Sequence, residues 1–178
     1  MTAATVPDTG LRNRAWAAVA AVTDPEIPVL TIADLGILRD VAITGAGDAD
    51  AQAVHVVITP TYSGCPAMDT IAADVNHALH AAGFPRVDVR LVHSPAWTTD
   101  WMTEEGRRKL ADFGIAPPSH HAPTGPVALT LGRRTAALVR CPQCGAPGRE
   151  QNRFGSTACK ALYICTSCAE PFDHFKAI

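Results

Sequence analysis

The sequence predicts an α+β protein, with a small two-layer α/β domain of order α-β-β-α-β-α on a mixed sheet, followed by a small four-cysteine metal ribbon. Three observations support this fold class. Segments with helical and strand periodicity alternate up to residue 114. A stretch with four prolines follows at 115–127. Residues 128–178 are too few to bury a core of their own and contain two Cys-x2-Cys pairs. We therefore expect domains at 1–114 and 128–178, joined by a linker at 115–127.

The composition is that of a globular protein, with 47% hydrophobic and 18% charged residues. No run approaches the 18 or so apolar residues that a membrane span needs, so no membrane partner is expected. The first ten residues combine neither a basic leader nor an apolar segment, so we expect no export signal and a cytoplasmic location. Cysteines in that compartment are more often reduced thiols or metal ligands than disulfides.

The formal charge is unevenly divided along the chain. Residues 128–178 hold seven Lys and Arg against three Asp and Glu, so this part carries +4 while the whole chain carries −2. A basic tail suits nucleic acid, but cations also offset the charge of a thiolate metal centre. Because no dense Lys/Arg run is present, we favour the second interpretation, and nucleic acid is not the expected partner.

The first elements are a helix and a hairpin. Apolar residues at helical spacing predict a helix at 10–22. Pro25 and Pro28 then stand too close together for a helix interior, which predicts a turn and an extended segment. Runs rich in β-branched residues at 37–44 and 53–59 flank a turn-forming stretch, and they predict two paired strands.

The next elements complete the sheet. Pro66 suits the first position of a helix, and Gly83 suits its end. Alternation at 86–92 predicts a third strand, and strand-helix-strand order implies a right-handed crossover onto the same sheet. A last helix is expected at about 103–113, where Thr103 can cap the first turn.

The two Cys-x2-Cys pairs are the strongest metal signal in the chain. They are separated by twenty residues, and each pair can turn back on one ion. Four thiolates at this spacing are typical of structural zinc, although a single iron or an iron–sulfur cluster uses the same ligands. Cys159, inside the loop, is a packed residue or an extra ligand for a cluster, and His174 is expected to be packed or exposed. The predicted ligands are Cys141, Cys144, Cys165 and Cys168.

Cys65 stands apart from the other five cysteines, directly before Pro66. If Pro66 begins the helix, Cys65 is its N-cap, and the helix amides should lower the pKa of the thiol. Such a thiol suits transient metal binding or exchange with a partner, while a small buried cap is the alternative. A cysteine hydrolase is not expected, because the spacing shows no Cys-His-Asn set. The candidate neighbours of the thiol are Asp34, Glu26, Thr59 and Thr61.

Two further groups of motifs carry a family resemblance. "DPEIPVLTIADLGILRDV" and "ITPTYSGCPAM" resemble the small domain shared by bacterial and eukaryotic iron–sulfur assembly factors. "SPAWTTDWMTEEGRRKLADFGIAPP" and "RFGSTACKALYICTSCAEPFDHFKAI" resemble the D-type subunit, also called J, of the bacterial phenylacetyl-CoA epoxidase, a multicomponent ring-activating oxygenase. In the assembly-factor domain, the position of Cys65 is the proposed functional cysteine, and Asp34 matches the acidic position of the Asp-Leu-Gly motif.

The resemblance implies an accessory role. The epoxidase has a di-iron carboxylate subunit and a reductase with flavin and an iron–sulfur centre. This chain has neither the paired Glu-x-x-His motifs of a di-iron bundle nor a Gly-rich nucleotide fingerprint, so we do not expect it to be catalytic. The first hypothesis is iron or iron–sulfur maturation of the oxygenase or reductase through Cys65. The second is a zinc-ribbon scaffold that bridges epoxidase subunits. The third is a nucleic-acid-binding ribbon. Homo-oligomer formation is left open.

Overall fold

The computed structural model describes residues 9–45, 52–118 and 138–176, and it divides the chain into two compact units, Met1–Trp97 and Thr98–Ile178. Most of the expected linker, and the first eight residues on which the export-signal prediction rests, lie outside the described residues. Among the described residues, no helix has the length and apolar character needed to cross a membrane.

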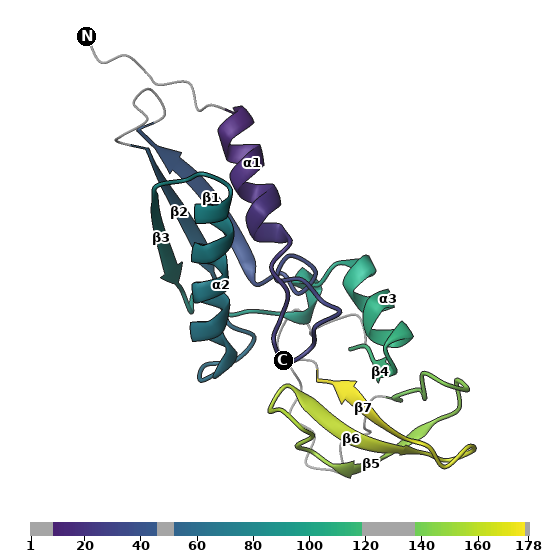
Figure 1. Ribbon diagram of the computed structural model, residues 1–178. Helices are drawn as coiled ribbons and strands as arrows, with labels where there is room; N and C mark the ends of the chain where they lie inside the picture. The colour runs from purple at the N-terminus through teal and green to yellow at the C-terminus, as the bar shows by residue number, and fades with distance from the viewer. Residues whose placement is uncertain (1–8, 46–51, 119–137, 177–178) are drawn as a thin grey trace. The chain divides into compact units, whose positions relative to one another are not determined.

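Within its described residues, the first unit contains a three-stranded sheet and two helices (Figure 1). The strand order is β1-β2-β3, in which β1 pairs with β2 antiparallel and β2 pairs with β3 parallel. This confirms the predicted mixed sheet. In chain order the elements are α1 (Thr9–Ala20), β1 (Leu38–Thr44), β2 (Ala53–Ile58), α2 (Ala67–Ala81) and β3 (Arg86–Leu91).

Both helices cover one face of this sheet, as Figure 1 shows: α1 packs on β1, α2 packs on β3, and the helices contact each other. The central strand β2 alternates half-buried and buried residues, which is the pattern of a sheet with one covered face. The core between the layers consists of fully buried aliphatic side chains. These include Val19, Val41, Val54, Val56, Ile71, Val75 and Leu79.

The segment between α1 and β1 is irregular but well packed. The Asp24 carboxylate accepts hydrogen bonds from the Glu26 and Ile27 amides at 2.8 and 2.9 Å, which turns the chain sharply at the two prolines. The Trp97 indole N–H donates to the Leu35 carbonyl at 2.8 Å and fastens the far end of the unit to this segment. These contacts hold the loop that carries Glu26 in place.

In residues 98–118 and 138–176, the described part of the second unit, there are a short 3-10 helix, one α-helix and a four-stranded sheet of order β4-β7-β6-β5. The pair β4–β7 is parallel, and the other two pairs are antiparallel. In chain order the elements are η1 (Thr99–Trp101), α3 (Glu104–Asp112), β4 (Ile115–Ala116), β5 (Gly148–Asn152), β6 (Lys160–Cys165) and β7 (Pro171–Phe175).

The boundary between the units lies at Trp97, earlier than the expected position at residue 114. The physical reason is β4, a two-residue strand at the start of the expected linker that adds to the sheet beside β7. Since α3 packs against β4, the helix belongs to the second unit. As predicted, Thr103 caps α3, and its hydroxyl accepts from the Gly106 amide at 2.9 Å.

Candidate metal centre and the Cys65 loop

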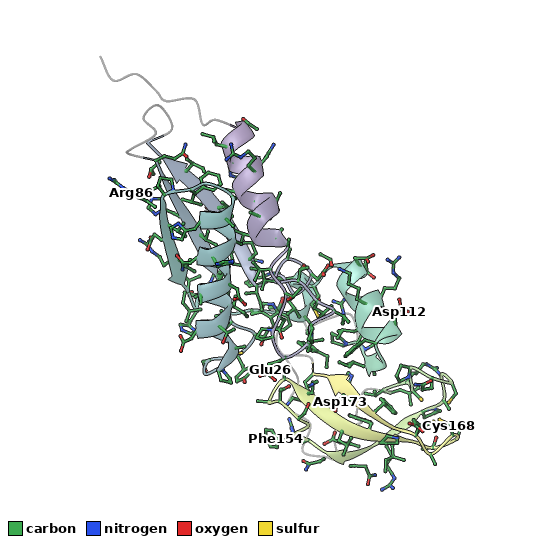
Figure 2. The ribbon with its side chains drawn as sticks, viewed as in Figure 1. Glu26, Arg86, Asp112, Phe154, Cys168 and Asp173 are labelled. Carbon is green, nitrogen blue, oxygen red and sulfur yellow. The ribbon has the colours of Figure 1, made fainter. Side chains whose placement is uncertain are left out.

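The four predicted ligands lie together at one end of the second unit. Their Sγ atoms are all within 4.8 Å of one another. The sulfur of Cys144 lies 3.4 Å from that of Cys165 and 3.6 Å from that of Cys168. Cys141 and Cys168 are 3.9 Å apart at their sulfurs. Figure 2 shows Cys168 in the turn between β6 and β7, and the first pair precedes β5 in the chain.

These distances fit one tetrahedral ion. With metal–sulfur bonds near 2.3 Å, a tetrahedron places neighbouring sulfurs roughly 3.8 Å apart. Cys141 and Cys165 are buried in the core of the ribbon with Tyr163 and Phe172, whereas the other two cysteines are exposed. The residues therefore fit a closed structural site, since two ligands anchor it to the core and two close it from outside.

The second Cys-x2-Cys turn is arranged to hold an anionic sulfur. The amides of Ser167 and Cys168 both donate to the Cys165 sulfur at 3.4 Å. These donors, first that of Cys168, lower the pKa of Cys165 to about 6. The Glu170 amide lowers the pKa of Cys168. Hydrogen bonds with the other three thiols, together with desolvation, outweigh this effect and raise the pKa of Cys168 to about 12. A cation among the sulfurs would remove this conflict by binding all four as thiolates.

The residue after each pair adopts a left-handed backbone. Gly145 follows Cys144 with φ +73°, and Ala169 follows Cys168 with φ +61°. Glycine adopts this conformation readily, whereas alanine rarely does, so Ala169 is the unexpected residue of the two. The sequence signal for Ala169 is its position directly after the second Cys-x2-Cys pair, which corresponds to that of Gly145 after the first pair.

Cys159 and His174 lie apart from the four ligands. Cys159 is buried, with its sulfur 3.0 Å from the Thr157 hydroxyl, and it precedes β6 while Cys165 ends that strand. Because β6 is extended over its six residues, Cys159 lies roughly 20 Å from Cys165 along the strand. The Nδ1 atom of His174 lies 3.1 Å from the Ala116 carbonyl oxygen, so this side chain links β7 to β4.

Cys65 is not the N-cap of α2, so that prediction was wrong. The cap is Pro66, with φ −68° and ψ −19°, and Cys65 comes one residue earlier. The direction of the pKa shift was also wrong. Desolvation raises the pKa of the Cys65 thiol above its usual value, more strongly than hydrogen bonds from the Ala67 amide and the Tyr62 side chain lower it.

Acidic side chains also act on Cys65. The charges of Asp24 and Glu26 raise its pKa further, so the segment after α1 lies within electrostatic reach of the thiol. Figure 2 shows Glu26 in this segment. Cys65 is only partly buried. The loop between β2 and α2 therefore presents a protonated, partly exposed thiol within electrostatic reach of two carboxylates.

The remaining candidate neighbours are buried. Asp34 makes a reciprocal pair with Thr31, in which each residue's amide donates to the other's side chain at 3.0 Å. Thr61 is 7% exposed and Thr59 is 1% exposed. Among the described residues the Thr59 hydroxyl has no hydrogen-bond partner. Of the three, only Thr59 and Thr61 belong to the segment that leads from β2 to Cys65, and Asp34 belongs to the segment between α1 and β1.

Comparisons with known protein families match both parts of the chain. Residues 12–90 match the family described as "Iron-sulfur cluster assembly protein", and residues 126–176 match "PaaD zinc beta ribbon domain". The first range includes Cys65, and the second includes all four clustered cysteines.

Individual proteins show the same two likenesses. The chain is 45% identical over 92% of its length to 91% of the D-type subunit of the "Putative 1,2-phenylacetyl-CoA epoxidase" from Escherichia coli (strain K12). It is 37% identical over 50% of its length to 80% of "Fe-S protein maturation auxiliary factor" from Porphyromonas gingivalis (strain ATCC BAA-308 / W83). A crystal structure of a DUF59 domain from Bacillus anthracis covers 57% of this chain and 92% of its own, with TM-score 0.50 and 26% identity.

Proposed function

Because the chain belongs to the family of D-type subunits of 1,2-phenylacetyl-CoA epoxidase, we propose that it is an accessory subunit of the epoxidase system that assists iron or iron–sulfur maturation of the oxygenase or reductase subunits. It would act in the cytoplasm, where thiols remain reduced. The observation that carries the proposal is the partly exposed Cys65 thiol, within electrostatic reach of Asp24 and Glu26, in the part of the chain that matches iron–sulfur assembly proteins.

The raised pKa of Cys65 changes how such a thiol would work. It rests protonated at neutral pH, so an incoming iron cation, as cargo, must displace the proton on binding. The charges of Asp24 and Glu26 disfavour a lone thiolate, but they attract a cation. The loop therefore suits transient loading, because the sulfur returns to the neutral thiol when the cation leaves.

We propose zinc as the ion of the ribbon. The four sulfurs all lie within 4.8 Å of one another, and three of the pairs are 3.4–3.9 Å apart, which leaves room for one ion and favours a single metal over a multi-iron cluster. The match to a zinc ribbon family supports zinc over a single iron. When bound, the ion supplies folding stability to the second unit, and its ligands would be the two Cys-x2-Cys pairs.

A zinc-ribbon scaffold that bridges epoxidase subunits is the second candidate. The raised pKa of Cys65 favours it, because a thiol that rests protonated is a weak nucleophile and a weak ligand. In this case Cys65 is a small packed residue, and assembly of the epoxidase depends on surfaces of the chain rather than on its thiol.

Cys65→Ser separates the two candidates. The full chain is expressed with the oxygenase and reductase subunits, and the iron content, sulfide content and stoichiometry of the purified complex are measured. Maturation predicts a complex that assembles normally but contains several-fold less iron. The control is Ser63→Ala, at an exposed position of the same loop. Full iron loading by Cys65→Ser at normal stoichiometry would exclude the maturation role and leave the scaffold.

A further inference from the structure

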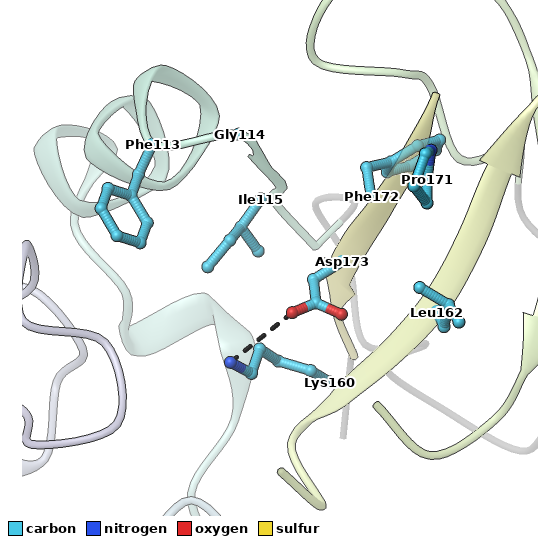
Figure 3. Close-up of a pocket in the computed structure, with 8 residues that line it drawn as sticks. All are labelled: Phe113, Gly114, Ile115, Lys160, Leu162, Pro171, Phe172 and Asp173. Atoms are coloured by element: carbon cyan, nitrogen blue, oxygen red, sulfur yellow. Dashed lines mark ion pairs between the residues drawn. The ribbon is translucent and has the colours of Figure 1, made fainter. Parts of the chain in front are cut away.

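A hollow in the second unit lies beside a row of three paired residues, one from each of the strands β4, β7 and β6. Ile115 of β4 pairs with Asp173 of β7, which pairs with Leu162 of β6. Figure 3 shows these three side chains around the hollow, with Phe113 on the side of Ile115 and Lys160 beside Asp173. The hollow has a volume of about 370 Å³. The residues that line it include Phe113, Ile115, Lys160, Leu162 and Asp173.

The hollow contains a buried cation with unused hydrogen-bonding capacity. The Lys160 side chain is 8% exposed, and its Nζ lies 3.6 Å from the Asp173 carboxylate. That distance is too long for a hydrogen bond, and within the described part of the chain no hydrogen bond from Nζ is found. An ammonium group has three N–H donors. Lys160 can therefore receive a second carboxylate while it remains close to Asp173.

Large apolar side chains at the rim are exposed to solvent. Phe113 is 55% exposed and Leu162 is 36% exposed. Aromatic and aliphatic side chains around a hollow are typical anchors in protein interfaces. A water-exposed rim next to a buried charge therefore indicates a surface that a partner covers.

A second hollow adjoins the first at Phe113 and Gly114. It has a volume of about 270 Å³ and extends to Pro142 and Gln143 in the first Cys-x2-Cys turn. Asp112, which is exposed, lies in its wall. We call the two hollows together the groove: Lys160 lines the first, Asp112 lines the second, and Phe113 lines both. Opposite charges in two adjoining hollows with a shared aromatic side chain suit an extended chain better than a small molecule.

We infer that this groove is the docking site for an extended segment of a partner protein, one that places a carboxylate on Lys160, an apolar side chain against Phe113 and Leu162, and a cationic side chain near Asp112. The inference rests on the proposed function, in which the chain acts on other epoxidase subunits, and it identifies where one of them binds. Because Phe113 and Asp112 are both exposed, they can be changed without opening the core.

The test measures binding of the full-length chain to the purified oxygenase and reductase subunits, each used as a probe in biolayer interferometry. Phe113→Ala should weaken binding to one of them by at least about tenfold, since truncation of an interface anchor commonly has such an effect. Asp112→Lys should weaken it by a similar factor, more strongly at low salt. Lys160→Met should also weaken binding, and circular dichroism verifies that each variant is folded.

Matched controls lie outside the groove. Phe154 is 65% exposed in the β5–β6 loop, so Phe154→Ala removes an exposed aromatic of the same unit. Asp100 is an exposed acid of η1, so Asp100→Lys makes the same charge reversal elsewhere. Both controls should bind as the unchanged chain does.

Other outcomes would overturn the inference. Equal binding by the groove variants and the controls would place the interface elsewhere, while the iron-loading result for Cys65→Ser would be unaffected. Saturable binding of phenylacetate that Lys160→Met abolishes would make the groove a small-carboxylate site. Loss of a self-associated state in Phe113→Ala, measured by analytical ultracentrifugation, would make the occupant a second copy of this chain. If neither subunit binds the unchanged chain, the proposed partners themselves are wrong.

Discussion

Replacing one exposed ligand tests the metal centre most directly. Cys144 is exposed, so its conversion to Ser removes almost no buried area, and in a metal-free protein the change should alter stability by no more than about 0.5 kcal/mol. Its sulfur nevertheless lies 3.4 and 3.6 Å from two other ligands. A large effect on stability would therefore report metal binding rather than packing.

The expected size follows from the coordination geometry. Structural zinc binding contributes about 10–16 kcal/mol to the folding of zinc-finger peptides, and an equal share for one of four ligands is about 3 kcal/mol. For a unit of this size each kcal/mol shifts the melting temperature by about 4–8 °C. Cys144→Ser should thus lower the melting temperature of the second unit by more than about 10 °C.

The assay is thermal unfolding followed by circular dichroism, with metal content measured by inductively coupled plasma mass spectrometry. Gln143→Ala, at the exposed neighbouring position, is the control and should change little. A strong chelator removes the whole contribution of the ion, so it should lower the melting temperature of the unchanged chain at least as far as Cys144→Ser does. If the chelator and the substitution both leave the melting temperature unchanged, the four sulfurs form no stabilising metal site.

Three further predictions concern single residues. Ala169→Gly should stabilise the second unit by up to about 1 kcal/mol, because it relieves the left-handed backbone, and chemical denaturation that shows a loss instead would contradict this. Burial lowers the pKa of His174 below 6.5, so as the pH falls the unfolded chain binds the proton before the folded chain does. The free energy of unfolding should therefore be full above about pH 6.5 and fall below it. His174→Gln should diminish this loss, as measured by denaturation at pH 7 and pH 5. Because burial raises the pKa of Cys65 above 9.0, alkylation by iodoacetamide, followed by mass spectrometry of the Cys65 peptide, should be slow at pH 7 and accelerate beyond pH 9, and a rate already maximal at pH 7 would show an anionic sulfur.

Residues close together in sequence made the ribbon predictable. Each Cys-x2-Cys pair is a local turn, and twenty intervening residues suffice for the strand and return that bring the pairs together. The same is true of the mixed sheet, whose strands were visible as runs of β-branched residues at 37–44 and 53–59. Such patterns depend on neighbours within one element, so they can be read without the tertiary structure.

Long-range packing decided what the sequence could not show. Spacing alone located Cys65 beside a helix start, but the pKa of its thiol depends on burial and on carboxylates from a segment more than thirty residues away. Desolvation there exceeds the effect of the helix amides, and only the folded arrangement determines that balance.

Local sequence therefore determined the mixed sheet with its two helices, the four clustered thiols and the position of the isolated thiol. The tertiary structure decided that β4 joins the sheet of the second unit and that the Cys65 thiol rests protonated. It also decided that Lys160 lies with Asp173 in a hollow that Phe113 lines. The physical reason is that turns and periodicity arise from adjacent residues, whereas burial, strand addition and charge pairing arise from segments distant in the chain.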